Sequence, residues 1–125
     1  MITLEEQQKL FLNVSKKLKK KMTVYAVGGT AMTLLGIKDT TLDIDIVFET
    51  NEDREAFKEA IISIGYQPID PIKIYGIKRD CPEMLTLDES RFDLFVINVI
   101  GFIFSEKSRP IFFPVIFNNK FFSRR

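Results

Sequence analysis

The strongest constraint on the fold is a short apolar segment, residues 42–48, that carries two aspartates, Asp43 and Asp45. Apolar and aspartate positions alternate in it, which is the pattern of a β-strand with two different faces. Residues two apart on a strand share a face at about 6–7 Å. The two carboxylates therefore lie side by side and repel each other. Such a strand needs a compensating group, unless its aspartate face simply looks into water.

A third carboxylate, Asp93, stands in a second apolar run at residues 91–97. If the two strands pair, about 4.8 Å apart, Asp93 joins Asp43 and Asp45. Carboxylate oxygens on rigid strands suit Mg²⁺ or Mn²⁺, and three of them can hold two metal ions for phosphoryl displacement. We expect these three residues to be metal ligands and catalytic residues, with Asp93 as a base toward an attacking hydroxyl.

Two consecutive glycines, Gly28 and Gly29, stand between a predicted strand and a predicted helix. Bare backbone N–H groups at the start of a helix favour a triphosphate. Thr30 adds a hydroxyl, either as a helix cap or as a phosphate donor. Arg91, two residues before Asp93 on the same face, is either a nucleotide contact or a charge that neutralises the carboxylates.

The periodicity of the chain predicts an α/β (α+β) fold, with a mixed β-sheet and helices packed on it. The expected helices span 4–20, 30–35 and 52–64, and the expected strands span 24–27, 42–48, 72–77 and 91–97. Thr3 and Glu6 form a capping-box signature before the first helix. Residues 80–88, which include Cys81 and Pro82, are expected to form a turn or an irregular link.

Composition excludes several classes of chemistry. The 125 residues are expected to form one domain, and the net charge of +1 gives no global field for nucleic acid. Because the chain contains no histidine, Ser-His-Asp, Cys-His and histidine-metal sites are excluded. A run of five lysines at 16–21 is either the solvated end of a helix or a phosphate-binding patch.

The sequence also predicts the location of the protein and the bounds of its domain. No secretory leader and no run of about 18 apolar residues is present, so we expect a cytoplasmic protein without a membrane partner. Residues 1–100 are expected to form the catalytic-type domain. Residues 101–125 hold seven of the twelve phenylalanines. We expect this tail to pack on the domain or on a second copy of the chain.

The order Val-Gly-Gly-Thr-Ala-Met at 27–32, Asp-Ile-Asp-Ile-Val at 43–47 and a later Asp93 resembles the DNA polymerase beta-like nucleotidyltransferase superfamily. It is most similar to small bacterial and archaeal members, including nucleotidyltransferase toxins of abortive-infection type, which belong to toxin–antitoxin systems. The resemblance covers about residues 24–99. It implies a nucleotidyltransferase fold, with Gly28 and Gly29 lining the triphosphate of ATP or another NTP. It also implies that Asp43, Asp45 and Asp93 hold the metal.

The function implied by this resemblance is transfer of a nucleoside monophosphate from an NTP to a hydroxyl, with release of pyrophosphate. The acceptor is left open among a tRNA, a protein and a small molecule, because the helical acceptor region usual in the family is replaced by the phenylalanine-rich tail. The alternative is a non-catalytic nucleotide-binding or interaction module that acts with a partner protein. A metal-dependent nuclease is disfavoured by the Gly28-Gly29 turn, which hydrolysis of a phosphodiester does not need.

Overall fold

The computed structural model describes residues 1–70, 82–96, 113–118 and 121–124. Its helices are α1 (Leu4–Lys17), α2 (Gly28–Leu34) and α3 (Asn51–Ser63). The strands of the main sheet are β2 (Met22–Ala26), β4 (Ile44–Phe48), β5 (Gln67–Ile69), β6 (Glu83–Leu87), β7 (Ser90–Val96), β8 (Phe113–Asn118) and β9 (Phe121–Arg124). Two short strands, β1 (Ile2–Thr3) and β3 (Thr40–Thr41), pair separately.

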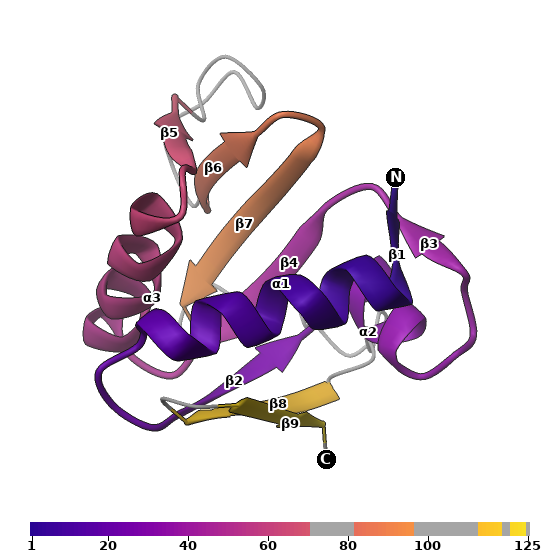
Figure 1. The fold of residues 1–125 in the computed structure, drawn as a ribbon, viewed down its shortest axis with the longest axis horizontal. Coiled ribbons are helices and arrows are strands. Elements are labelled where there is room, and N and C mark those ends of the chain that lie inside the picture. The colour runs from indigo at the N-terminus through magenta and orange to yellow at the C-terminus, as the bar shows by residue number, and fades with distance from the viewer. Residues whose placement is uncertain (71–81, 97–112, 119–120, 125) are drawn as a thin grey trace, which may run out of the picture.

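The described strands of the main sheet lie in the order β5-β6-β7-β4-β2-β8-β9 (Figure 1). The centre of the sheet is mixed, because β4 runs parallel to β7 and antiparallel to β2. The outer pairs β5-β6, β6-β7 and β8-β9 are antiparallel. This arrangement confirms the predicted mixed architecture of helices packed on a β-sheet.

Helices α1 and α3 pack on one face of the sheet through a cluster of aromatic rings. Phe11 of α1 lies edge-on to Phe117, with ring centroids 5.5 Å apart. Phe57 of α3 contacts Phe48 of β4, Phe92 of β7 and Phe117 of β8 at 5.2, 5.6 and 5.5 Å. Because side chains alternate along a strand, the neighbours of Phe48 and Phe92 in the sequence point to the opposite face of the sheet.

The first helix begins as predicted but ends earlier. The capping box is present, with the Thr3 side chain accepting from the Glu6 N–H and the Glu6 side chain accepting from the Thr3 N–H. The helix was expected to reach residue 20 and instead ends at Lys17. Leu18 takes an extended conformation and is buried in the core, which turns the chain toward β2. The later lysines of the run therefore lie beyond the helix.

The expectation of a turn or irregular link over residues 80–88 was wrong for residues 83–87, which form β6. This strand forms a hairpin with β7, and Asp88 in the connecting turn has a positive φ of 54°. Leu85 is fully buried in the core, so long-range packing stabilises a segment with weak local signals. The strand expected at 72–77 and Cys81 lie outside the described residues.

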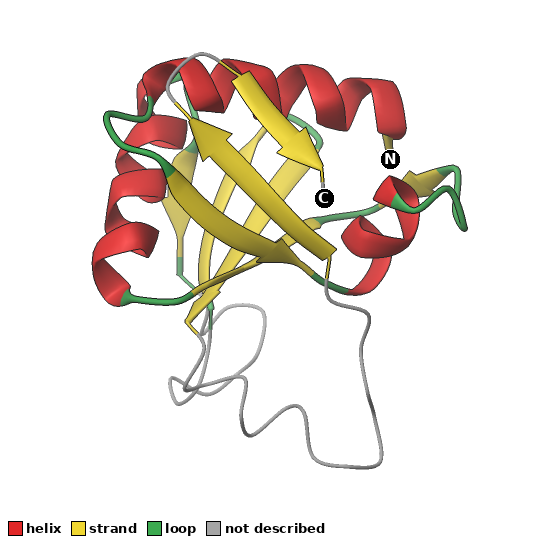
Figure 2. Cartoon of the chain, turned by 90° about the horizontal axis from the view of Figure 1, so that it is seen from below, coloured by secondary structure: helices red, strands yellow, loops and turns green. Residues whose placement is uncertain are grey.

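The described part of the phenylalanine-rich tail belongs to the main sheet. Strand β8 pairs with the central strand β2, and Phe117 is fully buried. Figure 2 shows β8 and β9 side by side at the edge nearest the viewer. Phe102, Phe104 and Phe112 lie outside the described residues. In the part of the chain that the structure describes, no helix combines the length and apolar character needed to cross a bilayer.

Candidate active site

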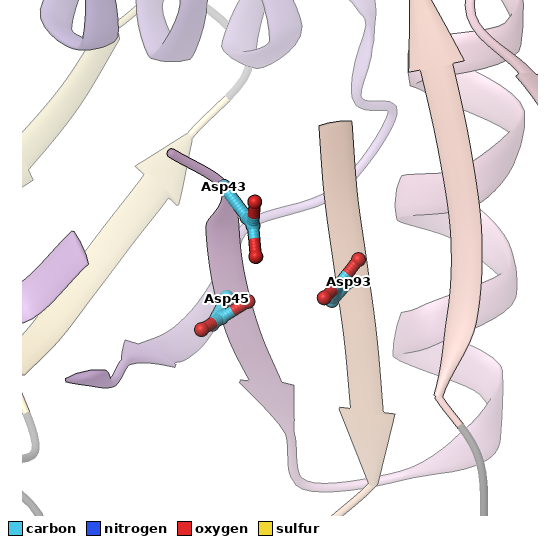
Figure 3. Close-up of side chains that lie close together, drawn as sticks. All are labelled: Asp43, Asp45 and Asp93. Carbon is cyan, nitrogen blue, oxygen red and sulfur yellow. The ribbon is translucent and has the colours of Figure 1, made fainter. Parts of the chain in front are cut away.

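The structure brings Asp43, Asp45 and Asp93 together on the sheet face opposite α1 and α3 (Figure 3). Asp45 of β4 is the register partner of Asp93 of β7 in the parallel pair. Asp43 lies immediately before β4, and one carboxylate oxygen from each residue falls within 4.8 Å of the others. The strand pairing on which the predicted cluster depended is therefore present.

The segment leading into β4 differs from the expected continuous strand. The strand was expected to begin at Leu42, but Leu42 precedes β4 and is 66% exposed. The carbonyl of Asp43 accepts hydrogen bonds from the hydroxyls of Thr30 at 3.1 Å and Thr41 at 3.0 Å. These two hydroxyls, rather than the strand ladder, hold the backbone of Asp43. No motif or spacing in the sequence pointed to Thr41.

Thr30 connects α2 to the aspartate-bearing strand. Its hydroxyl oxygen also accepts a hydrogen bond from the backbone N–H of Asp45 at 2.8 Å, and the residue is fully buried. Helix α2 has Val27 as its N-cap, without a side-chain capping bond, so Thr30 is not the cap. A hydroxyl has only one proton, and here that proton is donated to the carbonyl of Asp43. A phosphate contact of Thr30 stays a prediction, whereas its positioning of Asp43 and Asp45 is observed.

The two glycines of the turn face different parts of the site. Gly28 has a backbone φ of +58°, a value that residues other than glycine rarely adopt. A Cβ atom at this position would lie 3.6 Å from Oδ2 of Asp45, so the turn borders the carboxylate cluster directly. A Cβ atom at Gly29 would lie only 2.6 Å from Oγ1 of Thr41. Gly29 is therefore required where α2 packs on the segment before β4.

We expect Gly29→Ala to lower the free energy of unfolding by about 1–3 kcal/mol, because the added methyl group overpacks this contact. Without a clash, alanine in a helix would instead stabilise the protein by about 0.5–1 kcal/mol. Urea unfolding measures whether Gly29→Ala lowers or raises the free energy of unfolding. The matched control is the same substitution in a Thr41→Ala background, where the added methyl group meets no hydroxyl. An equal loss in both backgrounds would contradict the steric explanation.

Arg91 of β7 joins two of the three carboxylates. Its Nε donates to Oδ1 of Asp93 at 2.9 Å, and its Nη2 donates to Oδ2 of Asp93 at 3.2 Å. The same Nη2 donates to Oδ2 of Asp43 at 2.8 Å. These ion pairs are partly buried, and charge-assisted bonds of this geometry are among the stronger hydrogen bonds in proteins. Neutralisation of the cluster, one of the two predicted roles of Arg91, is thus present in the structure.

Asp45 keeps a raised pKa although the charge of Arg91 lowers it in part. Burial, followed by the charges of Asp93 and Asp43, raises the pKa of Asp45 to about 7. Among the described residues its Oδ1 atom is buried and has no hydrogen-bond partner. Burial also raises the pKa of Asp93, although Arg91 opposes that rise. The fold therefore keeps a desolvated carboxylate oxygen beside two other carboxylates, which is a costly arrangement.

No family model, curated protein or solved structure matches the chain. The resemblance to nucleotidyltransferases therefore stays a prediction. The functional argument depends on the geometry of the carboxylate cluster and on the glycine turn beside it.

Proposed function

We propose that the protein is a metal-dependent nucleotidyltransferase that moves a nucleoside monophosphate from an NTP to a hydroxyl acceptor and releases pyrophosphate. The observation that carries the proposal is the convergence of three carboxylates from two paired strands beside the Gly28 turn. Like charges are rarely gathered in a buried position unless a cation or a proton compensates them. Asp45 and Asp93 occupy strand positions, where aspartate is normally disfavoured.

The residues present fit a divalent cation. Asp43, Asp45 and Asp93 offer only hard oxygen ligands, which Mg²⁺ and Mn²⁺ prefer. The buried Oδ1 of Asp45, without a hydrogen-bond partner among the described residues, is a ligand atom already desolvated by the fold. Bound there, the metal would neutralise charge on the triphosphate and favour ionisation of the acceptor hydroxyl.

The remaining roles belong to the chain itself. The raised pKa of Asp93 suits a base that accepts the proton of the attacking hydroxyl. Thr30 holds Asp43 and Asp45 through their backbone atoms, so it keeps both carboxylates in register with Asp93. The backbone of Gly28 and Gly29 is proposed to approach the triphosphate, with Gly28 already adjacent to Asp45.

One observation favours the alternative, a non-catalytic nucleotide-binding or interaction module acting with a partner protein. Arg91 compensates Asp43 and Asp93 within the chain, so part of the cluster is stable without a metal ion. The two proposals differ in their product. The enzyme releases pyrophosphate when the correct acceptor is supplied, whereas the module binds nucleotide without turnover.

The deciding experiment incubates the protein with labelled NTPs, Mg²⁺ and total cell extract. Labelled tRNA, protein or small molecules would identify the acceptor class, and pyrophosphate release would report the reaction. Asp45→Asn is the inactive comparison, and Asp39→Asn removes a charge from an exposed position as the matched control. Nucleotide binding without label transfer or pyrophosphate in wild-type protein would favour the non-catalytic module.

Metal binding itself is expected to stabilise the fold. With Mn²⁺ or Mg²⁺ at about 100 times its dissociation constant, the free energy of unfolding should rise by about 2.7 kcal/mol. Asp43→Asn or Asp45→Asn should abolish most of this gain, while Asp39→Asn should keep it. Thermal unfolding with and without metal measures the effect. Equal stabilisation of wild type and both cluster variants would show that the metal binds elsewhere.

A further inference from the structure

We propose that Arg91 acts as a resident counter-cation that weakens the binding of a free metal ion to the carboxylate cluster and leaves the cluster when a metal–triphosphate complex binds. This inference rests on the proposed function and concerns the regulation of the same site. It predicts that metal and triphosphate bind cooperatively, with Arg91 as the coupling element. The consequence is a site that binds free Mg²⁺ or Mn²⁺ weakly and binds the metal–triphosphate complex more tightly.

The first argument is the position of the guanidinium. A single Arg91 side chain bonds both oxygens of Asp93 and one oxygen of Asp43. A metal ion shared by these residues needs oxygens from the same two carboxylates. Arg91 and the metal therefore compete for the same negative charge. A guanidinium left in place would also repel the incoming cation at close range.

The second argument is the asymmetry of the cluster. Arg91 pairs with Asp43 and Asp93, whereas Oδ1 of Asp45, the register partner of Asp93, is buried without a hydrogen-bond partner among the described residues. The buried Oδ1 of Asp45 is thus left as the ligand atom that Arg91 does not cover. Entry of a metal ion would satisfy Asp45 at the cost of the two arginine ion pairs. Free metal gains little from this exchange.

The third argument is the fate of the released arginine. Guanidinium groups bind phosphate oxygens in the same forked geometry that they use for carboxylates. A triphosphate beside the cluster gives Arg91 new acceptors when Asp43 and Asp93 turn to the metal. New ion pairs between Arg91 and the triphosphate offset the loss of its ion pairs with Asp43 and Asp93. This exchange requires both the metal ion and the triphosphate. Such reciprocal coupling is the thermodynamic form of cooperativity.

The test measures Mn²⁺ affinity by titration calorimetry, first alone and then as a complex with inorganic triphosphate, which avoids any dependence on the base. We expect Arg91→Gln to bind Mn²⁺ alone about tenfold more tightly than wild type. It should also lose most of the preference for the metal–triphosphate complex over free metal. Arg91→Lys keeps the charge but cannot fork across two carboxylates, so it should show an intermediate affinity. Arg54→Gln, which removes an arginine that pairs with Glu83, is the matched control.

The outcomes separate this proposal from the proposed function. Tighter binding of Mn²⁺ in the Arg91 variants, with no change in the Arg54 control, supports the inference. Equal Mn²⁺ affinity in wild type and a folded Arg91 variant overturns it and leaves the metal site intact. No Mn²⁺ binding in wild type or in either Arg91 variant, with or without triphosphate, overturns both. If Arg91→Gln does not fold, Arg91→Lys decides by the same criteria.

Discussion

Asp93→Asn is expected to lower the rate of nucleotide transfer by about 100-fold or more while the protein keeps much of its NTP affinity. Loss of a general base costs about 10²–10⁴ in rate. Asp93 is 2% exposed and directly opposite Asp45, a position from which it can act on a hydroxyl held at the cluster. Asparagine preserves the shape of the side chain but accepts no proton at neutral pH.

The comparison with Asp45→Asn separates a loss of catalysis from a loss of metal-dependent NTP binding. Asp45 supplies the buried oxygen without a hydrogen-bond partner among the described residues, so its loss should weaken metal-dependent NTP binding and turnover together. Both variants are measured by pyrophosphate release and by equilibrium NTP binding, with Asp39→Asn as the charge-matched control. Pyrophosphate release by Asp93→Asn at the wild-type rate would remove this residue from the catalytic machinery.

The metal-free protein is expected to lose stability as the pH rises from about 4 to 7. The pKa of Asp45 is about 7 in the fold against an ordinary value of 3.8. Below both values the residue is protonated in the folded and unfolded states and carries no penalty. Between them the folded protein holds a proton that the unfolded chain releases, so stability falls with rising pH. At about 1.4 kcal/mol for each pKa unit, the total loss is about 4 kcal/mol at most.

Asp45→Asn isolates this contribution. The variant removes the buried charge, and it also relieves Asp93, whose raised pKa acts in the same direction. The difference in free energy of unfolding between the variant and wild type should therefore grow in favour of the variant as the pH rises to 7 and stay constant above it. Urea unfolding in metal-free buffers between pH 4 and pH 8.5 measures the difference. A difference that does not change with pH would show that the buried carboxylate is not protonated in the fold.

Several features of the fold could be predicted because their causes are local. The alternation around Ile44–Phe48 and the apolar run that became β7 predicted two strands, since side-chain periodicity is a property of the strand itself. The capping box at Thr3 likewise depends on residues three apart. By contrast, β6 was missed because its stability comes from pairing with β7 and from burial of Leu85.

The candidate site divides in the same way. The sequence by itself determined which residues are candidates for the site, because aspartates in apolar strand segments are costly unless they have a compensating group. Only the tertiary structure decided that Asp45 faces Asp93, since the register of β4 and β7 is set by packing of the opposite face on the helices. It also decided that Arg91 reaches Asp43, 48 residues away in the chain. Contacts between such distant residues depend on the whole core, which no local pattern encodes.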